Sequence, residues 1–374
     1  MAEEVLKNVL EWCFKNTNIL EAKDNDGERL IHFAAENGYI SVVTQLLENG
    51  VSSDLEDDTG YTPLLFASQN DHIEITNLLL EYGANVETSD VLDWTSLHFA
   101  SDNNDLEMVN LLLENGANVN CQTKHKVSPL HLASNCGHIE LTKLLIEHGA
   151  IVNSSDHKGL APLHYASEKG FEEIAYLLLQ NGADVNCQDN TKTTPLHFAS
   201  IFGQPRIIEL LINNGANMNF ENYQNVTPLH LASEFGKSEI VKMLLENNVC
   251  LTIKNNDAKT ALDIAKEKKQ KEIYKMIYEK MIKLIYSKKT VKECAKEDCQ
   301  MEMKRMIFAN VDDMFISKEG KTCVVCFDER NGTFALQPCG HAKTCQKCSD
   351  KICRERKKCP LCRETVSKYQ KIYD

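Results

Sequence analysis

Long apolar runs are missing from the 374-residue sequence. No run approaches the roughly eighteen residues that a membrane-spanning helix needs. The first residues, Met-Ala-Glu-Glu-Val-Leu-Lys, do not form a basic-then-apolar signal peptide. These absences argue against a membrane partner and against secretion. We therefore expect a soluble intracellular protein located in the cytoplasm, with the nucleus as a second location. Its cysteines outside a metal site should stay reduced.

Catalytic motifs are also missing over residues 24–286. This stretch has no Ser/His/Asp set, no paired-carboxylate cleft, no phosphate-cradling glycine loop and no Walker lysine. We expect it to bind a partner and not to catalyse a reaction.

Positive charge is scarce in the first part of the chain. Residues 1–265 contain 15 Lys and Arg against 38 Asp and Glu, a net charge of −23, whereas residues 266–374 carry a net charge of +10. A basic tail can bind nucleic acid, but these basic residues are mixed with Glu and lack interleaved aromatic residues for base stacking. We expect no nucleic-acid partner, and the acidic part should attract a basic or extended protein segment.

A regular sequence repeat organises the acidic part. Its clearest markers are alanines at a constant spacing, namely Ala34, Ala67, Ala100, Ala133, Ala166, Ala199, Ala232 and Ala265. This period, and units such as Thr-Pro-Leu-His-Phe-Ala at residues 194–199, resemble the ankyrin repeat. The resemblance covers about residues 24–280 and implies eight stacked helix pairs in an elongated, curved solenoid that binds protein.

The repeat that begins at Asp156 shows why the pattern forms two helices. Pro162 suits the first turn of a helix, where its missing N–H needs no partner, and Gly170 suits a left-handed helix end. Ile174 and Leu178 belong to an apolar stripe, with Leu177, at helical spacing. One such repeat cannot bury its own faces, so stability must come from stacking.

Both ends of the array are expected to carry caps. Residues 1–23 should contain a capping helix near residues 3–15, and the eighth repeat turns polar at residues 266–271, as a terminal repeat requires. No glycine stands at Met281, so the last helix should continue to about Tyr286. We assign residues 24–286 to the solenoid, residues 287–317 to a linker with one short helix near 301–310, and residues 318–374 to a finger and tail.

Histidines recur at one position of the repeat, which favours a structural role, bonding neighbouring turns, over a metal or catalytic role. They are His98, His131, His164, His197 and His230. Trp94, beside a helix start, should cover the edge of the core; an anchor for a partner is the alternative. Residues at the hairpin tips vary from repeat to repeat, which suits recognition of a protein segment.

Cysteine is concentrated near the end of the chain, in the spacing C-x2-C-x12-C-x-H-x3-C-x2-C-x10-C-x2-C. The ligand candidates are Cys323, Cys326, Cys339, His341, Cys345, Cys348, Cys359 and Cys362. Each C-x2-C can direct two thiolates at one ion, so the set predicts two closed, tetrahedral zinc sites. A closed site stabilises a fold and leaves no position for a reactive water. Redox chemistry is disfavoured because no βαβ pattern surrounds the pairs.

This order of ligands resembles the C3HC4 RING finger. The resemblance implies a small cross-brace domain in which one Zn²⁺ is held by Cys323, Cys326, Cys345 and Cys348, and the other by Cys339, His341, Cys359 and Cys362. It also implies a RING-type E3 ubiquitin ligase, which binds a ubiquitin-conjugating enzyme and ubiquitin without a covalent intermediate, while the solenoid binds a protein substrate. The implied contacts to the conjugating enzyme are Val325, Ile352 and Pro360, with Arg363 as the cation that bridges it to the donor ubiquitin.

The finger further resembles the inhibitor-of-apoptosis class of RING in its Pro-Cys-Gly-His at residues 338–341 and in its short tail. That class implies a RING homodimer in which Tyr373 supports the ubiquitin of the opposite subunit. Glu364 and Lys368 make this tail less apolar than is common in the class.

The sequence thus predicts a mainly α protein, an ankyrin-repeat solenoid of about eight repeats followed by a small zinc-binding RING domain. Two hypotheses remain beside the ligase. One is a non-catalytic scaffold whose RING serves only for dimerisation, and the other is a protein that binds nucleic acid through its basic tail.

Overall fold

The computed structural model describes residues 22–247, 249–286, 302–303, 306, 334–337, 341–344 and 368–371. The chain divides into two compact units, Met1–Asn217 and Met218–Asp374. The helix predicted near residues 3–15 lies outside the described residues, as does most of residues 287–317. Within that second stretch, Glu302, Met303 and Met306 are helical, and both methionines are buried.

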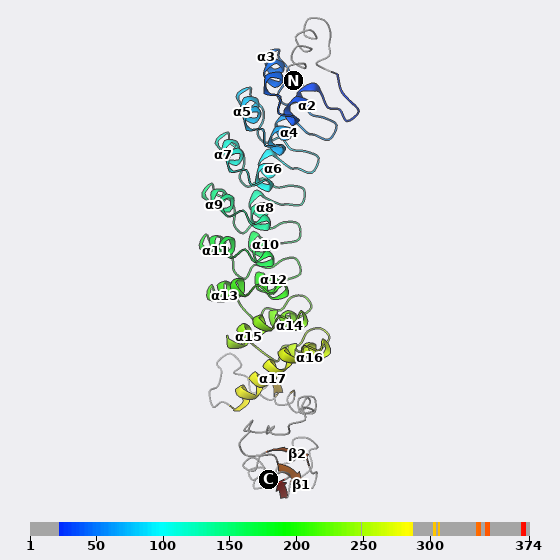
Figure 1. Cartoon of the computed structure of the whole chain (residues 1–374), viewed down its shortest axis with the longest axis vertical. Helices are drawn as coiled ribbons and strands as arrows, with labels where there is room; N and C mark the ends of the chain where they lie inside the picture. The colour runs from blue at the N-terminus through cyan, green and yellow to red at the C-terminus, as the bar shows by residue number, and fades with distance from the viewer. Residues whose placement is uncertain are drawn as a thin grey trace. The chain divides into compact units, whose positions relative to one another are not determined.

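Six helix pairs form the first unit. The first helices of the pairs are α2 (Leu30–Glu36), α4 (Pro63–Gln69), α6 (Ser96–Asp102), α8 (Pro129–Cys136), α10 (Pro162–Lys169) and α12 (Pro195–Phe202). The second helices are α3 (Ile40–Glu48), α5 (Ile73–Glu81), α7 (Leu106–Glu114), α9 (Ile139–Glu147), α11 (Glu172–Gln180) and α13 (Pro205–Asn213). In this unit the first helices stack in one column and the second helices in another, and the hairpin loops project beyond the first helices (Figure 1).

Single residues set the limits of α10, and an apolar stripe packs α11 onto the array. Proline occupies the first turn of α10, and Gly170 ends that helix at φ +82°, in the left-handed region that favours glycine. In α11, Ile174 and Leu178 are fully buried and Leu177 is half-buried. The prediction that each repeat forms two helices is confirmed for this repeat.

Alanine is required where the first helices meet. In the first unit the marker alanines have no solvent exposure, namely Ala34, Ala67, Ala100, Ala133, Ala166 and Ala199. A larger side chain at these positions would push neighbouring helices apart, because protein interiors are close-packed. The constant alanine spacing in the sequence therefore corresponds to one close contact per repeat in the column.

The recurring histidines join one repeat to the next. Nδ1 of His98 accepts a hydrogen bond from the N–H of Thr95 at 3.1 Å, and its Nε2–H donates to the carbonyl of Val127 at 3.0 Å, in the following repeat. His131 and His164 bond the same two positions of their own and the following repeat, at 3.0–3.1 Å. Each ring caps its own helix and holds the next hairpin, which confirms the predicted structural role.

The hairpin tips of the first unit are joined by backbone hydrogen bonds. The N–H of Val91 donates to the carbonyl of Thr59 at 3.1 Å, and the N–H of Lys124 donates to the carbonyl of Leu92 at 3.0 Å. Further along, the N–H of His157 donates to the carbonyl of residue 125 at 2.9 Å. Because this ladder uses only backbone groups, the tip side chains can vary without breaking it.

The second unit contains two further helix pairs, α14 (Pro228–Glu234) with α15 (Ser238–Glu246), and α16 (Ala261–Glu267) with α17 (Lys271–Tyr286). α14 packs against α16, and α15 packs against α17. Along α17, Ile277, Tyr278 and Met281 are fully buried. The described residues therefore contain eight helix pairs, the number predicted from the alanine markers.

Acidification should destabilise the first unit through its buried histidines. Burial lowers the pKa of His98 from the usual 6.5 to about 4, so below about pH 6.5 the unfolded chain takes up the proton first and stability falls with pH. Between pH 7.5 and pH 5.0 we expect His98 alone to reduce the free energy of unfolding by about 2 kcal/mol. Urea denaturation at the two pH values measures the change.

The matched variant for this test is His98→Asn, which keeps an acceptor for the N–H of Thr95 but cannot titrate. It should be less stable at pH 7.5, by about 1–2 kcal/mol, because the bond to Val127 is lost. Its stability should also fall less on acidification. An equal loss in both proteins would contradict the assignment.

Candidate functional site

Part of the predicted finger forms a three-stranded sheet. β1 (Phe334–Gln337) pairs antiparallel with β2 (His341–Thr344), with Leu336 opposite His341. Cys339 belongs to the short segment that connects the two strands, and Cys345 follows β2 directly in the sequence. In the sequence, Cys339 therefore precedes β2, His341 begins it and Cys345 follows it.

The C-terminal tail returns to this hairpin. β3 (Lys368–Lys371) pairs antiparallel with the free side of β1, so that the strand order is β2-β1-β3 and Tyr369 lies opposite Leu336. Sequence reasoning did not predict this strand. The segment Lys-Tyr-Gln-Lys is mostly polar, and its only strand signal is the single tyrosine.

Most of the predicted site residues lie outside the described residues. These are the ligand candidates Cys323, Cys326, Cys339, Cys345, Cys348, Cys359 and Cys362, and the contact candidates Val325, Ile352, Pro360, Arg363 and Tyr373. His341 is described as the first residue of β2. Seven thiols and one imidazole fit zinc by the chemistry of the donors, since Zn²⁺ in structural sites is bound by cysteine and histidine.

The helix pairs do not offer a second metal centre or a nucleophile. Among the described residues, no group of three or more His, Cys, Asp and Glu side chains could hold a metal ion. Burial raises the pKa of Cys121 and of Cys187 to about 12, so both thiols stay protonated and unreactive near neutral pH. The ring nitrogens of His98 are already used in hydrogen bonds within the array.

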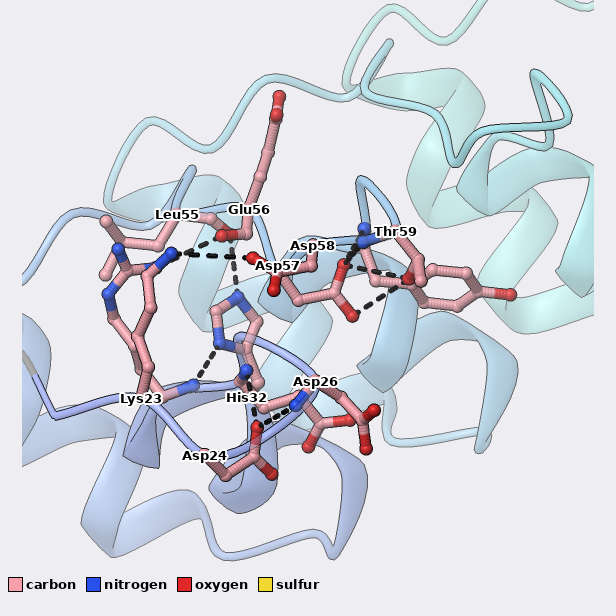
Figure 2. Close-up of polar contacts among 12 residues, drawn as sticks. Lys23, Asp24, Asp26, His32, Leu55, Glu56, Asp57, Asp58 and Thr59 are labelled. Carbon is pink, nitrogen blue, oxygen red and sulfur yellow. Dashed lines mark hydrogen bonds and ion pairs between the residues drawn. The ribbon is translucent and has the colours of Figure 1, made fainter.

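The first two hairpin tips of the first unit are acidic (Figure 2). Asp24 accepts a hydrogen bond from the N–H of Asp26 at 3.0 Å, within its own turn. On the next tip Asp58 lies 3.6 Å from the Nζ of Lys23, and both side chains are largely exposed, so this ion pair is weak. The first two tips therefore present exposed carboxylates.

An aromatic cluster follows the acidic tips at the start of α4 and α6. The ring of Trp94 lies 5.2 Å from that of Phe99, and Tyr61 lies 5.0 Å from Phe66 and 5.9 Å from Phe99, measured between ring centroids. Trp94 is half-buried, in accordance with the predicted cover for the core edge. Beside it, Val91 at the hairpin tip is 54% exposed, so apolar surface remains accessible here.

The comparisons with known proteins identify both parts of the chain. A model of the ankyrin-repeat family matches residues 2–90, 97–189 and 196–287. The chain belongs to the ankyrin-repeat family. A model described as "Zinc finger, C3HC4 type (RING finger)" matches residues 319–369, so this ankyrin-repeat protein carries a RING finger of a zinc-binding family at its C-terminal end.

Solved structures support the fold of the ankyrin array. The crystal structure of the ankyrin repeat domain of Bcl-3, a member of the IkappaB family, matches with a TM-score of 0.50 and 29% sequence identity. The match covers 55% of this chain and 94% of the Bcl-3 chain.

Curated relatives match the RING region. "E3 ubiquitin-protein ligase APD4" of Arabidopsis thaliana is 39% identical over 51 residues, which is 14% of this chain and 12% of that protein. "E3 ubiquitin-protein ligase XIAP" of Rattus norvegicus is 38% identical over 56 residues, 15% of this chain and 10% of that protein. The chain thus spans only about an eighth of APD4 and a tenth of XIAP. Separately, no helix in the described ranges has the length and apolar character to cross a membrane.

The rate of thiol labelling should differ between the exposed Cys136 and the buried Cys121 of the array. Cys136 is exposed and Cys121 is buried, and near pH 8 the thiolate fraction of Cys121 should be about a thousandfold below that of a thiol with a pKa of 9. Iodoacetamide labelling of the native protein, followed by peptide mass spectrometry, should modify Cys136 at least about tenfold faster. The difference should vanish in urea, and rapid native labelling of Cys121 would show that it is not buried as described.

Proposed function

We propose that this ankyrin-RING protein is a RING-type E3 ubiquitin-protein ligase, which recruits a ubiquitin-conjugating enzyme through the finger and a protein substrate through the array. The observation that carries the proposal is the RING match over residues 319–369, in which all eight ligand candidates are present. The ligase names of the relatives that match the same region support it.

Two zinc ions would hold the finger. Cys323, Cys326, Cys345 and Cys348 would bind one ion, and Cys339, His341, Cys359 and Cys362 the other. When bound, zinc supplies structural cross-links and no reactive water, because every ligand position is filled by protein. The match of the RING-finger family model to residues 319–369, which include all eight of these residues, supports this assignment.

Three residues are assigned to the conjugating enzyme and two to ubiquitin. Val325, Ile352 and Pro360 would form a shallow apolar surface for the enzyme. Arg363, which follows the last ligand, would donate hydrogen bonds to the conjugating enzyme and to the donor ubiquitin at once, because a guanidinium offers several N–H donors in a rigid fork. Tyr373 would support ubiquitin across a RING homodimer, and it lies shortly after β3 in the sequence.

Such a ligase needs no nucleophile of its own. Ubiquitin stays on the thioester of the conjugating enzyme until a substrate lysine attacks it, and the ligase accelerates this step by holding the reacting groups in a productive orientation. The protonated thiols of Cys121, which is buried, and Cys187, which is half-buried, agree with a purely binding role for the array. The variable tips on a constant backbone ladder suit the recognition of one particular protein substrate.

A self-ubiquitination assay with a panel of conjugating enzymes tests this proposal. Arg363→Ala should slow ubiquitin transfer about tenfold, the loss expected for roughly 1.4 kcal/mol of transition-state stabilisation. Val325→Ala should slow transfer about fivefold through weaker enzyme binding. Arg356→Ala changes an arginine of the same finger to which no contact is assigned, and it should keep full activity.

The same assay separates the ligase from the scaffold hypothesis. Cys323→Ala removes a proposed zinc ligand and should abolish transfer, while Arg363→Ala and Val325→Ala should retain the zinc content and thermal unfolding of the parent. Absence of activity with every conjugating enzyme would favour a scaffold whose RING only dimerises. Full activity of Arg363→Ala would overturn the role assigned to that residue alone.

A further inference from the structure

A surface hollow of about 600 Å³ lies across three second helices of the first unit, α3, α5 and α7. Its apolar lining includes Ile40, Ile73, Leu78 and Leu111. Ile40 is 41% exposed, and the other three are half-buried. In Figure 1 these helices belong to the column away from the hairpin loops, so the hollow is separate from the tip surface to which we assign the substrate.

Four glutamates of α5 and α7 also line the hollow, namely Glu74, Glu81, Glu107 and Glu114. All four are exposed, and none forms an ion pair with another described residue. Glu81 accepts one hydrogen bond, from the amide of Asn77 at 2.8 Å. Residues 30–123 contain sixteen Asp and Glu and no Lys or Arg, so the chain offers these carboxylates no nearby cation in sequence.

The later second helices of the unit do not repeat this arrangement. Lys143 of α9 occupies the repeat position that Asn110 holds in α7, and Arg206 of α13 occupies the position of Glu107. Gln180 of α11 likewise occupies the position of Glu114. The fold therefore tolerates cations and neutral residues at these positions, and the acidic rim of the hollow is a property of the sequence of α5 and α7.

We propose that this hollow binds a basic amphipathic helix of a partner protein, with leucine-like side chains on one face and Lys or Arg on both flanks. Packed helices lie about 8–10 Å apart, and residues seven apart on a helix lie about 10.5 Å apart along its axis. A partner helix that crosses α3, α5 and α7 can therefore place one apolar side chain over each gap. Its long basic side chains would bury their stems along Ile40 and Leu78 and reach the glutamates with their charged ends.

A synthetic peptide tests this proposal on the full-length chain. The probe is a fluorescein-labelled helix of leucine at the a and d heptad positions with lysine on the flanks. The first control has glutamate in place of lysine, and the second has serine in place of leucine. We expect the leucine-lysine peptide to bind with an affinity that falls as salt rises, and both controls to bind at least about tenfold more weakly.

Two double variants of equal charge locate the binding. The first double variant, Asn77→Lys with Asn110→Lys, introduces one lysine into α5 and one into α7, at the repeat position that Lys143 occupies in α9. It should weaken peptide binding about fivefold to tenfold. Gln180→Lys with Asn213→Lys makes the same change of charge on α11 and α13, outside the hollow, and should leave the affinity within about twofold. Circular dichroism and thermal unfolding should show that both variants fold like the parent.

The outcomes separate a built surface from general attraction to an acidic protein. Equal weakening by the two double variants, or binding of the serine peptide as tight as that of the leucine peptide, would overturn the proposal. So would cross-links from the peptide to the hairpin tips in place of α5 and α7. The test measures binding alone, so its result does not depend on ligase activity.

Discussion

The stacking of each repeat on the next is the constraint on which the array depends. A single helix pair cannot bury its own faces, so every repeat relies on contacts with its neighbours. Two devices fix these contacts, an alanine in every repeat and a histidine in most repeats; Leu65 and Asp263 stand at the histidine position of the second and eighth repeats. Alanines such as Ala100 allow the first helices to approach closely, and imidazoles such as that of His98 connect a helix start to the next hairpin.

Because buried alanines and histidines hold the repeats together, the residues on the surface can vary. The tips are joined through backbone groups, and the second helices of the first unit need only their inner stripe, as Ile174 and Leu178 show in α11. Charge can therefore accumulate on the outside without disturbing the stack. That freedom explains how residues 30–123 can lack every Lys and Arg while the repeat geometry continues unchanged.

Much of the array could be predicted from the sequence because its signals are local. Pro162 and Gly170 mark the limits of a helix through their own backbone chemistry, and the alanine period counts the repeats. The hollow beside Leu78 and Leu111 was not predicted, because it arises where helices of three successive repeats meet. β3 was also missed, since a strand of Lys-Tyr-Gln-Lys is defined by its pairing with β1 and hardly by its own residues.

The finger differs from the array in the origin of its stability. The array gains stability from apolar contacts repeated many times, whereas a domain of about fifty residues buries too little surface to rely on such contacts alone. We propose that zinc, bound by the eight candidate ligands of the finger, compensates for this small core. The proposed activity follows from the same feature, because a rigid finger can position a conjugating enzyme and ubiquitin without any reactive group of its own.

The zinc content of the purified, reduced protein tests this account most directly. Inductively coupled plasma mass spectrometry should find two zinc ions per chain, and titration with a thiol reagent should release both as the cysteines of residues 323–362 react. A chain without zinc, or one in which those cysteines form disulfides with each other, would contradict the assignment of the finger and with it the proposed ligase.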